Sequence, residues 1–194
     1  MKSPLCYQAT EFDCVPTTFI NCLRYLLPRN EILPTVVQSI YMYSFDTFNR
    51  NGEKGKKGTT YFAVQYICNW LNHFGETNNL NIRYDTLEIE DICLGENSEI
   101  TQCLDTGGVA IIRVYFTTTL YHYVLLTYID KDFVYIFDPY YREKVFKEQE
   151  IEIVFDKPFQ YNRKINRTWF ESIENKKYAL GIVEERECIL AHQI

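Results

Sequence analysis

The chain has 194 residues, of which 46% are hydrophobic and 24% charged, which fits one folded domain with a substantial core and excludes a disordered or fibrous protein. The net charge of −6 disfavours a general nucleic-acid binder or a protein that coats anionic membranes, because both classes usually carry a basic surface. No apolar run is long enough to span a bilayer, and no hydrophobic segment follows the N-terminal residues. We therefore expect a single domain over residues 1–194, no membrane insertion, no nucleic-acid partner and no signal peptide.

Seven cysteines and three histidines limit the chemistry further. The number of cysteines is odd and no two of them are three residues apart, which argues against a secreted disulfide framework and against a Cys-x-x-Cys zinc or redox site. The histidines, His73, His122 and His192, have no metal-ligand spacing. We expect a reducing, cytoplasmic location, no metal and no cofactor.

The first half of the chain has the apolar periodicity of helices. It predicts a helix over Cys14–Leu27, because Pro16 is tolerated in a first helical turn and Pro28 ends the run. The same periodicity predicts further helices in three segments: after Pro34, from Gly58 to Gly75, and from Ser98 to Leu104.

Residues 49–58 contain three of the eight glycines and predict an exposed, mobile loop between the second and third helices. The lysines of this loop are Lys54, Lys56 and Lys57. They could contact an acidic peptide or a phosphate, but a solvated loop is the simpler interpretation.

The second half of the chain is rich in β-branched and aromatic residues, which predicts strands. The predicted strands are 109–116, 121–129 and 133–138, and the segments 178–183 and 187–190 predict one or two more. Asp130-Lys131-Asp132 predicts a hairpin turn, whereas 151–175 gives no clear prediction. Helices first and strands later predict an α+β fold, in which the N-terminal helices pack on one side of a C-terminal antiparallel sheet.

Four polar residues have the order and the element types that thiol-based acyl chemistry requires. Cys14 is expected at the start of a helix, where unpaired N–H groups and the helix dipole stabilise a thiolate. His122 lies near the start of one predicted strand and Asp138 at the end of the next, so a hairpin would bring both to one edge of the sheet. The imidazole could then take the thiol proton while Asp138 fixes its orientation. Gln8, six residues before Cys14, could join the backbone N–H of Cys14 in binding an oxyanion.

Each of these residues also has a structural interpretation. A cysteine in an apolar helix is usually a small buried hydrophobe, a single histidine can belong to the core, and Asp138-Pro139 alone is an ordinary turn. The rivals are weaker, because Cys6 has no helix behind it, His73 ends a helix and His192 lies close to the C-terminus. Order, element type and strand pairing together favour the catalytic interpretation.

Three motifs resemble those of the peptidase C39-like group: Gln8-x5-Cys14 with Asp13 before the cysteine, His-Tyr-Val at 122–124, and Asp-Pro at 138–139. These are papain-fold domains, best known as the bacteriocin-processing peptidases that cut after a double-glycine leader. The resemblance covers the order of elements along the whole chain, with identity concentrated in the three motifs. It implies a papain-like fold with Cys14 as nucleophile, His122 as general base and acid, Asp138 as the residue that orients the histidine, and Gln8 in the oxyanion hole.

The chain departs from this family in two ways. The family commonly has glycine after the cysteine, whereas Val15 stands here, which bears on the substrate class more than on the fold. The best-known leader peptidases are fused to a transporter, whereas this sequence has neither transmembrane segments nor a nucleotide-binding motif.

Three functions of different classes are compatible with these residues. The first is a cytoplasmic cysteine peptidase or amidohydrolase that acts on a peptide or amide. The second is an acyltransferase that works through a Cys14 thioester in a biosynthetic pathway, since the same acyl-enzyme serves hydrolysis and transfer. The third is a catalytically silent papain-fold module that binds a peptide through the tyrosines near the site, Tyr115, Tyr121, Tyr123, Tyr140 and Tyr141. The sequence gives neither the substrate nor the oligomeric state.

Overall fold

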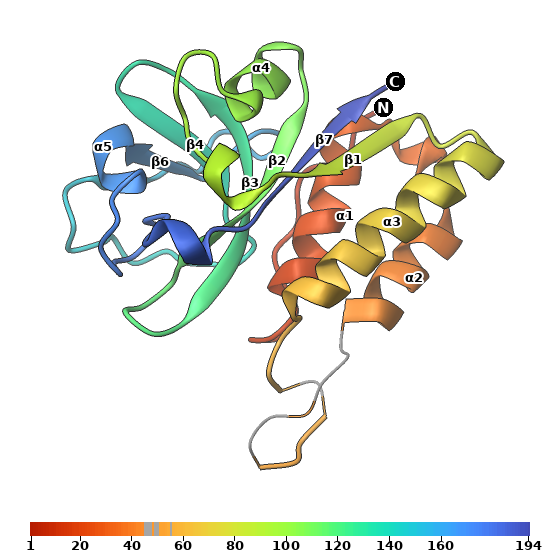
Figure 1. Ribbon diagram of the computed structural model, residues 1–194, viewed down its shortest axis with the longest axis horizontal. Coiled ribbons are helices and arrows are strands. Elements are labelled where there is room, and N and C mark those ends of the chain that lie inside the picture. The colour runs from red at the N-terminus through yellow and green to blue at the C-terminus, as the bar shows by residue number, and fades with distance from the viewer. Residues whose placement is uncertain (45–47, 49–50, 55) are drawn as a thin grey trace.

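An antiparallel sheet is the framework on which the helices pack (Figure 1). The computed structural model describes residues 1–44, 48, 51–54 and 56–194. Within these residues the strand order is β1-β7-β2-β3-β4-β6-β5, and every neighbouring pair is antiparallel. The strands are β1 (Ile82–Thr86), β2 (Val109–Tyr115), β3 (Tyr121–Ile129), β4 (Phe133–Phe137), β5 (Ile151–Ile153), β6 (Arg163–Asn166) and β7 (Cys188–Gln193).

The predicted helices are confirmed, with small shifts at their ends. The helix that opens with Cys14 ends at Leu26, two residues before Pro28. The third helix begins at Tyr61, where the side chain of Thr60 accepts the N–H of Ala63. The α-helices are α1 (Cys14–Leu26), α2 (Pro34–Ser44), α3 (Tyr61–Asn78), α4 (Glu99–Asp105) and α5 (Arg167–Phe170). Among the helices in the described part of the chain, none is long and apolar enough to cross a bilayer.

The sheet is covered on both faces, not on one as the sequence predicts. On one face Ile111 and Leu125 pack in a cluster with α1, α2 and α3, which stand side by side (Figure 1). On the other face Ala110 and Ile112 pack against α4 and α5. Nearly every residue of β2 is buried, which is typical of a strand with helices on both faces. The mixed helix-and-sheet fold is therefore confirmed. The first three helices share one face as predicted, whereas the predicted helix at 98–104 lies on the other face as α4.

Of the one or two strands predicted over 178–183 and 187–190, the second forms as β7 and the first does not form. Tyr178 has a φ of 59°, in the left-handed region that interrupts a strand, and Gly181 has a φ of 75°. The segment still pairs briefly with β2, because Tyr178 N–H donates to the carbonyl of Tyr115 and Tyr115 N–H donates to that of Ala179. Residues Val183–Glu185 form a 3₁₀ helix instead of extended chain.

Strands β1, β5 and β6 and helix α5 have no counterpart in the sequence prediction. They contain three to five residues each, and polar residues interrupt them. β6 is held between β4 and β5, and β1 lies beside β7 at the edge. Pairing with strands that are distant in the chain stabilises such short segments, and local sequence does not show that pairing.

The predicted loop 49–58 is exposed where it is described. Residues 49, 50 and 55 lie outside the described residues. Residues 51–54, 56 and 57 are exposed, and Gly52 and Gly58 have φ angles of 78° and 84°. The glycines therefore supply backbone conformations that other residues rarely adopt.

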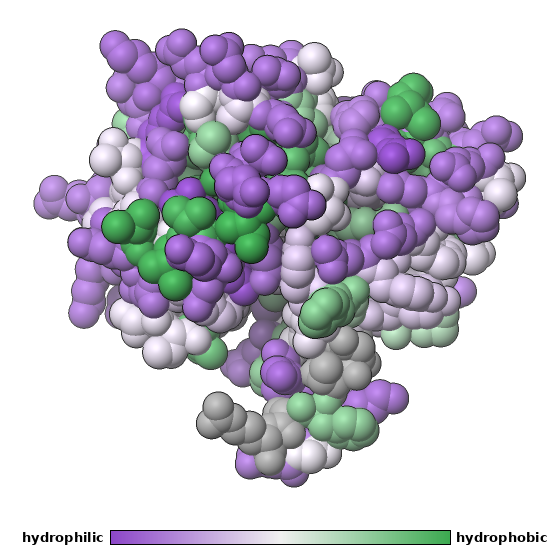
Figure 2. Space-filling model, viewed as in Figure 1, coloured by the Kyte–Doolittle hydropathy of each residue, from purple (hydrophilic) through white to green (hydrophobic). Residues whose placement is uncertain are grey.

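One apolar patch interrupts the largely hydrophilic surface in Figure 2. It lies on the side of the molecule away from α1, α2 and α3, over the segment near Val183–Glu185. Ile182 and Val183, at the start of this segment, are exposed apolar residues. Neither lines the cleft that contains Cys14.

Replacing Gly181 by alanine should lower the free energy of unfolding by about 3 kcal/mol. The residue has a positive φ, and a Cβ there would overlap the buried ring of Tyr115. Gly95 is the matched control, because a Cβ at that position meets nothing within 4 Å. Urea denaturation of Gly181→Ala and Gly95→Ala measures the difference, and equal stabilities would contradict this packing.

Candidate active site

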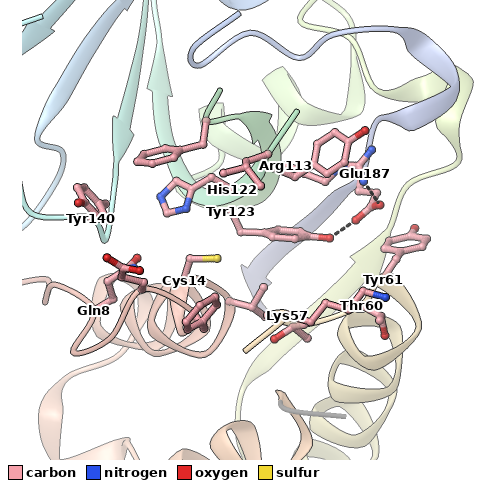
Figure 3. A pocket seen from close by; sticks show the side chains of 18 of the residues that line it. Gln8, Cys14, Lys57, Thr60, Tyr61, Arg113, His122, Tyr123, Tyr140 and Glu187 are labelled. Carbon is pink, nitrogen blue, oxygen red and sulfur yellow. Dashed lines mark hydrogen bonds and ion pairs between the residues drawn. The ribbon is translucent and has the colours of Figure 1, made fainter. Parts of the chain in front are cut away.

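A cavity of about 630 Å³ opens between the first turns of α1 and α3 and the ends of β2 and β3 (Figure 3). Cys14 and His122 both line it, and in Figure 3 the Cys14 sulfur points from α1 toward the strands that carry His122 and Tyr123. Gln8 and Tyr140 close one end. The sequence-predicted residues Gln8, Cys14 and His122 are thus brought to one cleft.

The first turn of α1 is left uncapped at Cys14. The Asp13 carboxylate is buried and turns back to accept the N–H groups of Ala9 (3.0 Å) and Thr10 (2.8 Å) and the Thr10 hydroxyl (2.7 Å). It therefore makes no capping hydrogen bond to the helix. Among the described residues, no acceptor is found for the backbone N–H groups of Cys14 and Val15. The positive end of the helix dipole therefore remains available at the thiol.

His122 bonds Asp138 and lines the cleft together with Cys14. Its Nε2 lies 2.6 Å from Oδ1 of Asp138, and both side chains are buried. Nδ1 is then the nitrogen left for Cys14. Burial by itself would lower the pKa of His122, but the Asp138 carboxylate and the hydrogen bonds to Asp138 and Cys14 raise it to about 10. The imidazolium form is therefore favoured beside the thiol.

A β-bulge places His122 and Asp138 on the same face of the sheet. Leu125 pairs with Phe137 and Leu126 with Ile136, but the register shifts by one between Leu126 and Tyr128. Continuing the pairing beyond Phe137 sets Asp138 opposite residue 124, diagonal to His122. The shift means that β3 has one extra residue at this point. Without it, the Asp138 side chain would lie on the opposite face of the sheet from His122, because the side chains of neighbouring residues in a strand point to alternate faces.

Asp138 is fixed from every side. Its Oδ1 also accepts the N–H of Tyr140 at 2.7 Å, and its Oδ2 accepts the hydroxyl of Tyr178 and lies 3.9 Å from the Arg163 guanidinium. Asn162 binds its backbone twice, accepting the Asp138 N–H at 2.7 Å and donating to the carbonyl at 2.8 Å. Burial would raise the pKa of Asp138, but His122, Arg163 and the Tyr178 hydrogen bond lower it overall. The residue is therefore a carboxylate at neutral pH.

Three of these partners were not found from the sequence. Asn162 and Arg163 fall in the segment 151–175, which gave no clear prediction, and Tyr178 falls in the strand that does not form. They lie 24 to 40 residues from Asp138 in the chain. Asn162 and Arg163 reach it through the pairing of β4 with β6, and Tyr178 reaches it through the short pairing of its segment with Tyr115 at the end of β2. Tyr178 has a left-handed backbone conformation at the position from which its hydroxyl donates to the Asp138 carboxylate.

Gln8 is tied to the site through its backbone and its side chain. Its N–H donates to the carbonyl of Pro139, the residue after Asp138, at 2.8 Å. Its Nε2 donates to the carbonyl of Thr10 at 2.7 Å, which identifies the nitrogen of this amide, since a carbonyl can only accept. Among the described residues, no partner is found for the second N–H of Nε2, and Oε1 of the same amide is buried without a hydrogen bond.

The rival residues lie outside this arrangement. Cys6 is part-buried, its backbone bonds the Asn21 side chain, and burial raises the pKa of its thiol. His192 lies 3.8 Å from Asp85 at the β1–β7 edge, and His73 does not line the cleft. Within residues 1–44, 48, 51–54 and 56–194, no group of three His, Cys, Asp or Glu side chains could hold a metal ion.

Several predicted neighbours also reach the cleft. Of the five tyrosines expected near the site, Tyr121, Tyr123 and Tyr140 line it, whereas Tyr115 and Tyr141 do not. Val15, the departure from the family pattern, is buried and contributes to the cleft wall next to Cys14. Among the lysines of the glycine-rich loop, Lys57 reaches the cleft.

The chain matches no protein-family model, and no curated protein is significantly similar to it.

The imidazole of His122 should remain protonated well into the alkaline range. Because its pKa in the folded protein is raised from 6.5 to about 10, its contribution to stability is complete below pH 6.5 and is lost as the pH rises toward 10. ¹⁵N NMR of the ring should detect protonation of both nitrogens at about pH 8. Asp138→Asn should move the midpoint down by more than one pH unit, whereas Asp85→Asn, which removes the partner of His192, should leave it unchanged. A His122 midpoint near 6.5 in the unaltered protein would contradict the pairing.

Tyr178→Phe should lower the free energy of unfolding by about 2 kcal/mol, because it removes a hydrogen bond to a buried charge. Tyr84→Phe is the matched control, since its equally buried hydroxyl has no hydrogen bond to oxygen or nitrogen among the described residues. Thermal or urea unfolding compares the two variants. Equal losses would mean that the Tyr178 hydroxyl does not stabilise the Asp138 carboxylate.

Proposed function

We propose that this chain is a cysteine peptidase or amidohydrolase in which Cys14, His122 and Asp138 act as a triad. The observation that carries the proposal is the buried His122–Asp138 pair at 2.6 Å, whose imidazole also interacts with a thiol at an uncapped helix N-terminus. A nucleophile, a base that reaches it and a third group that orients the base are the parts that thiol-based acyl transfer needs.

In the first step the Cys14 thiolate attacks the carbonyl carbon of a peptide or amide, and a carbon–sulfur bond forms. The carbonyl electron pair moves to oxygen and produces an oxyanion. The His122 imidazolium then gives its Nδ1 proton to the leaving nitrogen, and the carbon–nitrogen bond breaks. An amine leaves and a thioester on Cys14 remains.

The oxyanion would be stabilised by the open donors of the cleft. These are the backbone N–H groups of Cys14 and Val15 and the second Nε2–H of Gln8. Donors that are already oriented before the reaction require little reorganisation as charge develops, which lowers the barrier. The hydrogen bonds of Asp13 and Gln8 within residues 8–13 fix that orientation.

In the second step water attacks the thioester. His122, now neutral, takes a proton from the water, and the carbon–sulfur bond breaks to release the acid and restore the thiolate–imidazolium pair. Asp138 stays ionised throughout, since its role is to hold the imidazole and stabilise its positive charge.

The order of the elements is compatible with the papain-like architecture that the C39-like resemblance implies. The nucleophile opens the first helix, and the histidine and aspartate follow on adjacent antiparallel strands. All seven cysteines are free, which suits a reducing compartment such as the cytoplasm. We therefore also propose that the fold is papain-like and that the protein is located in the cytoplasm.

Alkylation with limiting iodoacetamide at about pH 6 tests the activated thiol, because an ordinary thiol is almost wholly protonated there. Cys14 should react at least about tenfold faster than Cys93, which is the matched internal control because it is the exposed cysteine. Peptide mapping gives the rate at each cysteine. His122→Ala should remove the advantage of Cys14.

Two results would contradict the triad. One is Cys93 reacting as fast as Cys14, and the other is a rate at Cys14 that is unchanged in His122→Ala. Once a substrate is found, Cys14→Ala should abolish its turnover while leaving the fold intact by circular dichroism.

A further inference from the structure

A row of polar side chains crosses the sheet beside Cys14 and takes no part in the chemistry above. Arg113 on β2 pairs directly with Tyr123 on β3. On the other side, Arg113 N–H donates to the carbonyl of Glu187 at 3.0 Å, immediately before β7 begins. The side chains of these three residues therefore share one face of three neighbouring strands.

The same face is apolar two residues further from the cleft on each strand. There Ile111 pairs with Leu125 and Ile189, and all three are buried in the cluster with α1, α2 and α3. The polar row begins where that helical cover ends, and its three members line the cleft (Figure 3). The row thus forms the floor of the cleft on the side away from Gln8.

The contacts within the row leave hydrogen-bonding capacity at the cleft. Arg113 Nη1 lies 2.7 Å from Oε1 of Glu187, and Oε2 of Glu187 accepts the Tyr123 hydroxyl. The guanidinium lies 4.0 Å from the ring of Tyr121, which holds its plane in place. No other hydrogen bond of the guanidinium occurs among the described residues, so most of its N–H groups remain available.

The Arg113–Glu187 ion pair is not explained by a need to stabilise the fold. The Arg113 and Glu187 side chains are each only 13% exposed, and apolar residues of similar size are often as stabilising as a buried ion pair. The pKa of Glu187 is raised, chiefly by burial and also by the nearby Glu185 carboxylate, although Tyr123 and Arg113 act to lower it. The site therefore keeps a partly desolvated donor and acceptor side by side next to the thiol.

A peptide amide has the complementary pattern, since it offers a carbonyl acceptor and an N–H donor. Arg113 and Glu187 together carry no net charge. A ligand carboxylate would be repelled by Glu187, and a ligand ammonium would be repelled by Arg113. We propose that Arg113 and Glu187 bind a backbone amide of the substrate, with Arg113 donating to its carbonyl and Glu187 accepting its N–H. This rests on the proposed function and narrows it to substrates that continue as a peptide beyond the bond attacked by Cys14.

Peptidyl chloromethyl ketones test this subsite. Acetyl-capped alanine probes of one, two and three residues alkylate Cys14, and each rate is divided by the rate with iodoacetamide, which has no peptide. In the unaltered protein this ratio should rise with probe length. In Arg113→Met the rise should shrink about tenfold, the loss expected for a hydrogen bond to a charged donor.

Arg83→Met is the matched control. Arg83 also pairs with a carboxylate, Asp85, but on β1 and with both side chains exposed. It should keep the full rise with probe length. If Arg113→Met does not fold, Arg113→Met/Glu187→Gln removes both charges together and takes the same measurement. A ratio that does not rise with length, or that rises equally in the Arg113 variant, overturns the subsite.

Failure of the proposed function gives a different result. Cys14 would then resist iodoacetamide in the unaltered protein. In that case the Arg113 Nε–H signal of Cys14→Ser is followed by NMR while acetyl-trialanine N-methylamide is added. A saturable shift of that signal, absent for Arg83, supports the amide subsite, and no shift overturns it.

Discussion

A fully buried carboxylate at Asp138 is the constraint on which the rest of the candidate site depends. An ionised group removed from water is costly unless charges and hydrogen bonds compensate it. Here the compensation comes from His122, Tyr140, Arg163 and Tyr178. These groups come from several parts of the second half of the chain, so the carboxylate ties the end of the sheet together while it holds the imidazole.

The segment before α1 arranges hydrogen-bond donors on the other side of the cleft. Asp13 could cap its own helix, yet its carboxylate stabilises the turn at residues 9 and 10. The helix consequently keeps open N–H groups at Cys14, and the same turn presents the Gln8 amide. A local loss of helix capping is thus linked to a cluster of donors where negative charge would develop.

The cleft joins these two halves and adds a polar floor. Helices α1 and α3 cover the apolar part of one face of the sheet, and their first turns lie where that face becomes polar. Reactive groups and the Arg113–Glu187 pair therefore occupy the boundary between the helical layer and the open end of the sheet. Residues on rigid strands and helix starts are held more precisely there than residues on a loop would be.

The sequence by itself determined the four longer helices and the central strands and singled out the four candidate residues, because apolar periodicity, the hairpin turn and helix punctuation are local signals. It did not give the second covered face, the interruption at Tyr178 or the short strand β6, which depend on pairing between distant segments. Only the tertiary structure decided that His122 and Asp138 share a face, since that depends on one extra residue in β3. It also supplied Asn162, Arg163 and Tyr178, because a buried charge recruits partners by proximity in space and not by spacing along the chain.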